Sequence, residues 1–95
     1  MDIKSSSNGV TINGNIKSVG DFQAIKRELD TFSSSQKNLT IHIVDSLSMT
    51  SSVIGYFNKL VLKDKINIQM KVGNAQLLEL LDDLGLKSIF NAKKA

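Results

Sequence analysis

Hydrophobic side chains recur every three or four residues in three segments of this chain, and mainly polar side chains fill the positions between them. This spacing places the hydrophobic side chains on one stripe of an α-helix. The three stripes are Phe22, Ile25, Leu29 and Phe32; Val53, Ile54, Phe57, Leu60 and Val61; and Leu77, Leu78, Leu80, Leu81 and Leu84. The pattern therefore predicts three amphipathic helices.

Capping residues mark the ends of the first and third helices. Ser18 and Asp21 have the spacing of a capping box, so the first helix begins there and ends near Phe32. Asn74 is a favourable N-cap for the third helix. Gly85 is placed to take the left-handed conformation that ends it.

The segments between these helices read as strands. Residues 39–44 (LTIHIV) form a near-continuous run of hydrophobic and β-branched side chains, which is expected of a central strand covered on both faces. Residues 66–72 alternate hydrophobic and polar side chains, as a half-exposed strand does. A last short strand is expected at residues 86–90.

A hairpin is predicted at the N-terminus. Residues 1–4 and the segment that begins at Val10 flank Asn8-Gly9, a strong hairpin signal. Asn13-Gly14-Asn15 interrupts the alternation and indicates a bulge or a strand end there. The polar run at 33–38 is expected to be a loop.

The predicted order of elements is β-β-α-β-α-β-α-β, which favours an α/β fold with a mostly parallel sheet and an antiparallel first strand. The 95 residues suit one domain. In open α/β sheets, functional sites lie beyond the carboxyl ends of the strands. Residues 45–52 fall at such an end.

Composition excludes several classes of function. The chain has no cysteine, and therefore no disulfide framework, thiolate nucleophile or cysteine-ligated metal site, and we expect a cytoplasmic protein. No hydrophobic run approaches the roughly 20 residues of a membrane span, and the N-terminus lacks the hydrophobic centre of a signal peptide. Direct insertion into a membrane is not expected.

The net charge of +3 arises from the C-terminal segment. Residues 1–86 hold nine basic and nine acidic side chains, and the excess is Lys87, Lys93 and Lys94. Arginine occurs once and aromatic side chains are few, so the sequence does not predict nucleic-acid binding. We expect residues 91–95 to be a frayed basic tail.

The sequence shows no catalytic set, metal site or cofactor site, and we do not expect the protein to be an enzyme. His42, the only histidine, lies in the middle of a predicted strand with nothing to complete a triad. Asp82 and Asp83 are adjacent on a helix, so their side chains diverge. Neither a G-x-G-x-x-G motif nor a Walker A motif is present.

The candidate functional stretch is the joint between the strand at 39–44 and the second helix, which begins at Ser51 or Ser52. Ser51, Ser52, Gly55 and Lys59 lie off its hydrophobic stripe. A glycine inside an exposed helix costs roughly 1 kcal/mol relative to alanine. A partner that approaches the backbone closely explains its presence.

The strand LTIHIV, the joint Met49-Thr50-Ser51-Ser52-Val53-Ile54-Gly55 and the closing segment 74–90 resemble a STAS domain, the fold of bacterial anti-sigma factor antagonists. The resemblance covers residues 9–90. The family commonly reads Met-Asp-Ser-Ser-Gly-Leu-Gly at the joint, and its first serine, which a partner kinase phosphorylates, falls on Ser51.

The sequence also departs from the family pattern. Thr50 stands where the family often has aspartate, and Val53 where it has glycine. The upstream strand aspartate is replaced by His42 or displaced to Asp45. The usual final helix is missing.

The resemblance implies a bacterial regulatory module of transcription, a monomer or weak dimer, that docks an anti-sigma factor or a GHKL-type serine kinase. Ser51 is the implied phosphoacceptor, with Ser52 and Thr50 as alternatives, although a serine at a helix start is often only an N-cap. The implied partner-binding residues are Asp45, Met49, Thr50, Ser51, Ser52, Gly55, Tyr56 and Lys59. The alternative is a non-phosphorylated STAS subunit that binds the ATPase of a membrane lipid transporter.

Overall fold

The computed structural model describes residues 1–32 and 37–95 and shows a five-stranded sheet with three helices. The strands are β1 (Asp2–Ser5), β2 (Gly9–Asn13), β3 (Asn38–Ile43), β4 (Asn67–Val72) and β5 (Ala92–Lys94), and the helices are α1 (Val19–Asp30), α2 (Ser51–Leu62) and α3 (Ala75–Asp83). The strand order is β1-β2-β3-β4-β5, with β1 antiparallel to β2 and the other pairs parallel. The predicted fold class and order of elements are confirmed.

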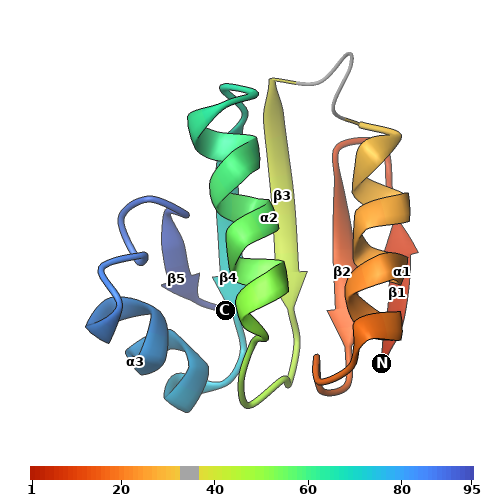
Figure 1. The fold of residues 1–95 in the computed structure, drawn as a ribbon. Coiled ribbons are helices and arrows are strands. Elements are labelled where there is room, and N and C mark those ends of the chain that lie inside the picture. Colours follow the sequence, from red (N-terminus) through yellow and green to blue (C-terminus); the bar gives the residue numbers. More distant parts are fainter. Residues whose placement is uncertain (33–36) are drawn as a thin grey trace.

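All three helices cover the same face of the sheet (Figure 1). This arrangement follows from the strand order, because each parallel strand is added on the same side of the previous one. Connections between parallel strands are right-handed, so successive connections in one direction must pass over one face. The core fills the space beneath the helices, and no helix of residues 1–32 or 37–95 covers the opposite face.

The single helical layer corrects the prediction for β3. Leu39, Ile41 and Ile43 are buried under the helices, whereas Thr40 and His42 are half-buried on the opposite face. The prediction of a strand covered on both faces was wrong. In β4 the expected alternation is confirmed, with its three hydrophobic side chains buried.

The predicted caps of α1 and α3 are confirmed. The backbone N–H of Asp21 donates to Ser18 Oγ over 3.1 Å, and the Ser18 N–H donates back to the Asp21 carboxylate over 3.2 Å. A further bond from the Lys17 N–H is the main cause that lowers the pKa of Asp21. Asn74 caps α3, and Gly85 follows that helix with φ of 74°.

The C-terminal segment differs from the prediction. Residues 87–91 form turns in place of the strand expected at 86–90, and Phe90 is buried with its ring centroid 6.0 Å from that of Phe57. The last strand is Ala92–Lys94, which pairs with β4, so the expected frayed tail is largely part of the sheet. The Lys94 ammonium group also donates to the carbonyl oxygen of Gly73 over 2.8 Å. Burial of Phe90 and the pairing with β4 hold this segment in place.

The N-terminal hairpin is confirmed, with Ser5 opposite Val10. Gly9, however, is the first residue of β2, where the position of a Cβ atom is occupied by the carbonyl oxygen of Thr40. Close approach of two strands therefore accounts for this glycine. The predicted loop at 33–38 lies mostly outside the described residues, and Asn38 already belongs to β3.

Candidate functional site

The loop between β3 and α2 is fixed to the loop that follows β2. The Asp45 carboxylate accepts a hydrogen bond of 2.7 Å from the N–H of Gly14. Ser46 Oγ accepts one of 3.0 Å from the N–H of Ile16 and donates one of 2.7 Å to the Ser48 carbonyl oxygen. These bonds join the carboxyl ends of two neighbouring strands and position the start of α2.

Sequence reasoning overlooked two residues that hold these two loops together, Ser46 after β3 and Asn15 after β2. Ser46 is fully buried, and both of its hydrogen-bonding functions are satisfied within the protein. Asn15 accepts a 2.9 Å bond from the N–H of Leu47. The signal available in the sequence was the polar turn at Asn13-Gly14-Asn15, which faces the loop once the two strands pair. Asp45, predicted to bind a partner, is exposed and orders this loop.

The N-cap of α2 is Thr50. Its Oγ1 accepts a hydrogen bond of 3.3 Å from the N–H of Val53, and Thr50 is half-buried. Ser51 and Ser52 occupy the first two helical positions and are exposed. Within the part of the chain that the structure describes, no hydrogen bond engages either hydroxyl group, so Ser51 is not the residue that caps the helix.

Gly55 lies one turn further along the exposed face of α2. Apart from its two chain neighbours and the backbone of its own helix, no atom of the described residues lies within 4 Å of the position that a Cβ atom would take there. Internal packing therefore does not require a glycine at this position, although helix propensity disfavours it. Lys59, the next exposed residue on this face, forms an ion pair of 3.4 Å with Asp64.

Two predicted partner-binding residues, Met49 and Tyr56, are buried, each with 6% of its surface exposed. Most of each side chain is therefore inaccessible to a partner, and partner binding by these two residues stays a prediction. Tyr56 lies three residues after the fully buried Val53, and α1 covers that side of α2. The Tyr56 ring meets the Phe22 ring edge-on, with 6.1 Å between the ring centroids. Both residues support the surface from below.

A small charged cluster joins α1 and α2 at Tyr56. The Tyr56 hydroxyl donates to Asp30 over 2.7 Å, and the Lys26 ammonium group pairs with the same carboxylate at 2.8 Å. The bond from Lys26, followed by that from Tyr56, lowers the pKa of Asp30. Burial, followed by the bond to Asp30, raises the pKa of Tyr56. Lys26 and Lys59 both lie within 6 Å of the ring centroid, a cation–π arrangement.

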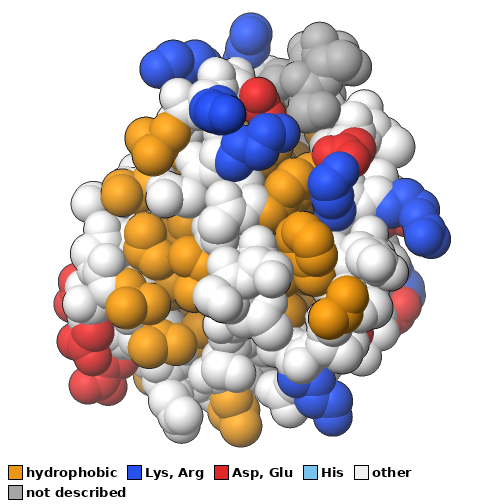
Figure 2. Space-filling view, in the orientation of Figure 1, with side chains coloured by type: hydrophobic (Ala, Val, Ile, Leu, Met, Phe, Trp, Pro, Cys, Tyr) orange, Lys and Arg blue, Asp and Glu red, His pale blue; other side chains and the backbone are white. Residues whose placement is uncertain are grey.

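Hydrophobic side chains gather over α3 and between it and α2 (Figure 2). The half-buried side chains on these two helices are Ile54, Val61, Leu78 and Leu80, and Leu47 and Leu84 are about half exposed. A pocket of about 270 Å³ lies between Leu47 and Leu80. The polar first turn of α2 therefore has an exposed hydrophobic neighbour, which is typical of protein-binding surfaces.

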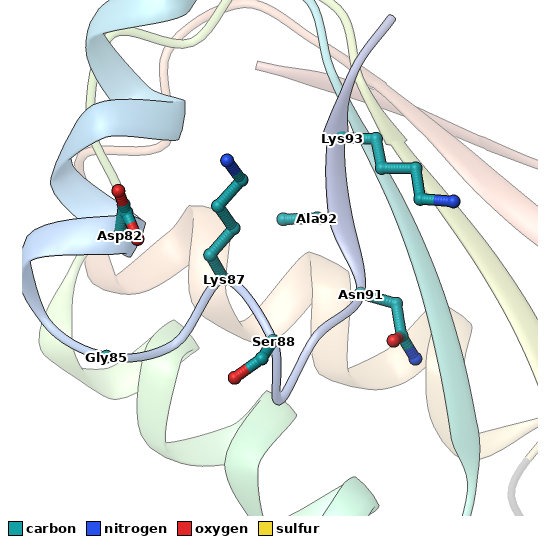
Figure 3. A pocket seen from close by; sticks show the side chains of 7 residues that line it. All are labelled: Asp82, Gly85, Lys87, Ser88, Asn91, Ala92 and Lys93. Carbon is teal, nitrogen blue, oxygen red and sulfur yellow. The ribbon is translucent and has the colours of Figure 1, made fainter.

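The strand order gives this sheet no point at which the direction of winding reverses, and such a point is where open α/β sheets usually hold ligands. A separate pocket of about 380 Å³ lies between α3 and β5. Asn91 and Lys93 extend to the far side of β5, away from Asp82 and Lys87 (Figure 3). Their side chains do not converge on one point in this pocket, as catalysis would require.

No group of three or more potential metal ligands occurs among residues 1–32 and 37–95. Across the same residues, no helix is long and hydrophobic enough to cross a membrane. A scan of the chain against protein-family models finds no matching family, and a search among curated proteins finds no match.

Proposed function

We propose that this protein is a regulatory docking module of the anti-sigma factor antagonist type, and not an enzyme. Its docking surface comprises Ser51, Ser52, Gly55 and Lys59 of α2, with Leu47 of the preceding loop and Leu80 of α3, which lines one pocket with Leu47. The observation that carries the proposal is Gly55: it is exposed, has empty space where a side chain would lie, and weakens the helix that contains it. A partner whose backbone or side chains pack against the bare helix turn accounts for it.

The same surface suits a phosphorylation switch at Ser51. Its hydroxyl group is exposed and lies in the first turn of α2, where unpaired N–H groups and the helix dipole favour an anion. A phosphate there adds about −1.5 to −2 charges to the docking surface without straining the fold. We propose that phosphorylation releases the partner through repulsion and desolvation.

The proposed partner is an anti-sigma factor or a serine kinase of the GHKL type, in a bacterial cytoplasm. The resemblance at residues 49–55 supports this choice. Thr50 is a departure from the family pattern, which often has aspartate at this position. In this chain Thr50 uses its side chain to cap α2, and it brings no negative charge to the site before phosphorylation. Phosphorylation of Ser51 would therefore turn a nearly neutral surface into a negatively charged one.

The experiment is a pull-down from the native cell with wild-type bait, Ser51→Ala and Ser51→Asp, followed by intact-mass analysis of each recovered bait. Retention of a kinase or anti-sigma factor by the alanine variant, its loss from the aspartate variant and a phosphate on the wild type are the expected results. Ser52→Asp tests whether a negative charge at the neighbouring serine releases the partner as well. Ser88→Asp, an exposed serine in the turn before β5, is the matched charge control.

The second candidate is a constitutive subunit that binds the ATPase of a membrane lipid transporter through the same helix. The hydrophobic neighbours of the docking surface, Leu47 and Leu80, favour it, because a permanent interface needs no charge switch. Binding of one ATPase by the wild type and both Ser51 variants, with no phosphate on any bait, would support this candidate and overturn the switch.

A further inference from the structure

The uncovered face of the sheet carries a row of basic and hydroxyl side chains that crosses all five strands. The register places Lys4 of β1 opposite Thr11 of β2, and Thr11 opposite His42 of β3. His42 is in turn opposite Lys71 of β4, which is opposite Lys93 of β5. Residues in register share one face, so these five side chains stand side by side about 5 Å apart.

The centre of this row opens into a polar pocket of about 320 Å³. Its lining side chains include Thr11, Thr40, His42 and Lys71, with Ser6 and Asn8 at the hairpin. Gly9 also lines it, and its lack of a side chain, which the Thr40 carbonyl oxygen requires, keeps that side of the pocket clear. The pocket lies on the opposite face of the sheet from the helices.

The polar groups of this pocket are available to a ligand. Among the described residues, no hydrogen bond or ion pair within the protein engages the side chains of Thr11, Thr40, His42 or Lys71. No carboxylate is among the described residues that line the pocket. Asp2 lies on the same face of β1, two residues before Lys4 and opposite Asn13. It does not line the pocket.

We propose that this pocket binds a phosphate monoester. Lys71 supplies charge and up to three donors, His42 supplies an imidazole N–H, and the hydroxyl groups of Thr11 and Thr40 supply further donors. A phosphate group has several oxygen atoms that accept such bonds at once, and charged acceptors make the strongest ones. The row contains no phenylalanine, tyrosine or tryptophan on which successive bases could stack, which favours a single phosphate group over a nucleic-acid strand. The inference is independent of the docking surface on α2.

The test is an NMR titration of the isotopically labelled protein, in which the amide chemical shifts report ligand binding. The probes are inorganic phosphate and O-phosphoserine, and free serine at the same ionic strength is the ligand control. Saturable shifts confined to residues 9–12, 40–42 and 69–71 are expected with both phosphate probes and not with serine. Lys71→Gln and His42→Gln should each weaken phosphoserine binding by about tenfold or more.

Matched variants separate a pocket from a general effect of charge. Lys63→Gln makes the same charge change at the exposed C-terminal end of α2 and should leave the affinity unchanged. Lys93→Gln removes a charge from the same row outside the pocket and should weaken binding by less than threefold. Absence of saturable shifts overturns the proposal. Equal losses in Lys71→Gln, Lys93→Gln and Lys63→Gln also overturn it, because they describe a diffuse basic surface. Thermal melts verify that each variant is folded.

Discussion

The Tyr56 hydroxyl donates a 2.7 Å hydrogen bond to Asp30, and this contact fastens the helix of the docking surface to its neighbour α1. Tyr56→Phe keeps the ring packed against Phe22 and removes only the donor. We expect the free energy of unfolding to fall by about 1 kcal/mol, the usual value of one such bond. Urea unfolding measures it. In a double-mutant cycle with Asp30→Ala, which removes the acceptor, a coupling energy near zero would contradict the assigned contact.

Tyr56 also makes the stability of the fold depend on pH in the alkaline range. Burial raises the pKa of Tyr56 above its ordinary value of 10.0, so the unfolded chain loses this proton before the folded protein does. The stability due to the un-ionised tyrosine is complete below pH 10 and declines as pH rises further. Tyr56 is the only tyrosine, so tyrosinate absorbance reports it alone. Tyr56→Phe should remove this part of the pH dependence, and a Tyr56 that titrates at its ordinary pKa when folded would disprove the assignment.

Gly55 and Gly20 form a matched pair for the docking surface. Both are exposed glycines inside helices, and a Cβ atom at Gly20 meets nothing closer than 3.7 Å. Alanine at either position should stabilise the fold by about 0.5 to 1 kcal/mol, through helix propensity. Gly55→Ala should in addition weaken binding of the captured partner, whereas Gly20→Ala should not. Equal partner binding by both variants would remove the reason for the docking proposal.

The capping roles at the start of α2 make a fourth prediction. Thr50→Ala removes the acceptor for the N–H of Val53 and should lower the free energy of unfolding by about 1 kcal/mol. Ser51→Ala should change it by less than about 0.5 kcal/mol, since its side chain is exposed and unbonded. The reverse order in thermal or urea unfolding would make Ser51 the cap and would weaken its assignment as a free phosphoacceptor.

The elements themselves could be predicted from the sequence because local physics determines them. The capping box at Ser18 and Asp21, the cap Asn74 and the alternation in β4 all involve residues close in the chain. The exposure of Ser51, Ser52, Gly55 and Lys59 also followed from the helical period.

The errors concern contacts between distant segments. The burial of Tyr56 depends on α1, 26 residues earlier at Asp30. The open face of β3 depends on the strand order, which no local pattern contains. The strand at Ala92–Lys94 depends on pairing with β4, so its lysines looked like a solvated tail. The polar pocket at Thr11, His42 and Lys71 was hidden for the same reason, because its residues come from three strands.

Gly73 permits a last prediction, about the carboxyl ends of the strands and the docking loop, residues 44–50 between β3 and α2, which includes Leu47 of the docking surface. Its N–H donates to the Ile43 carbonyl oxygen over 2.8 Å, and the place of a Cβ atom is taken by the backbone oxygen of Val44. Gly73→Ala must therefore push apart the carboxyl ends of β3 and β4, and we expect a loss of more than about 2 kcal/mol in the free energy of unfolding.

Gly85→Ala is the control, because that position has open space but a left-handed backbone, with φ of 74°. Conformational strain alone should cost about 1 kcal/mol there. Amide shifts should separate the two effects further: Gly73→Ala should perturb residues 44–50, because Val44 leads directly into the docking loop, whereas Gly85→Ala should leave them in place. If the two variants lose equal stability and neither moves residues 44–50, the close contact between Gly73 and Val44 does not constrain the docking loop.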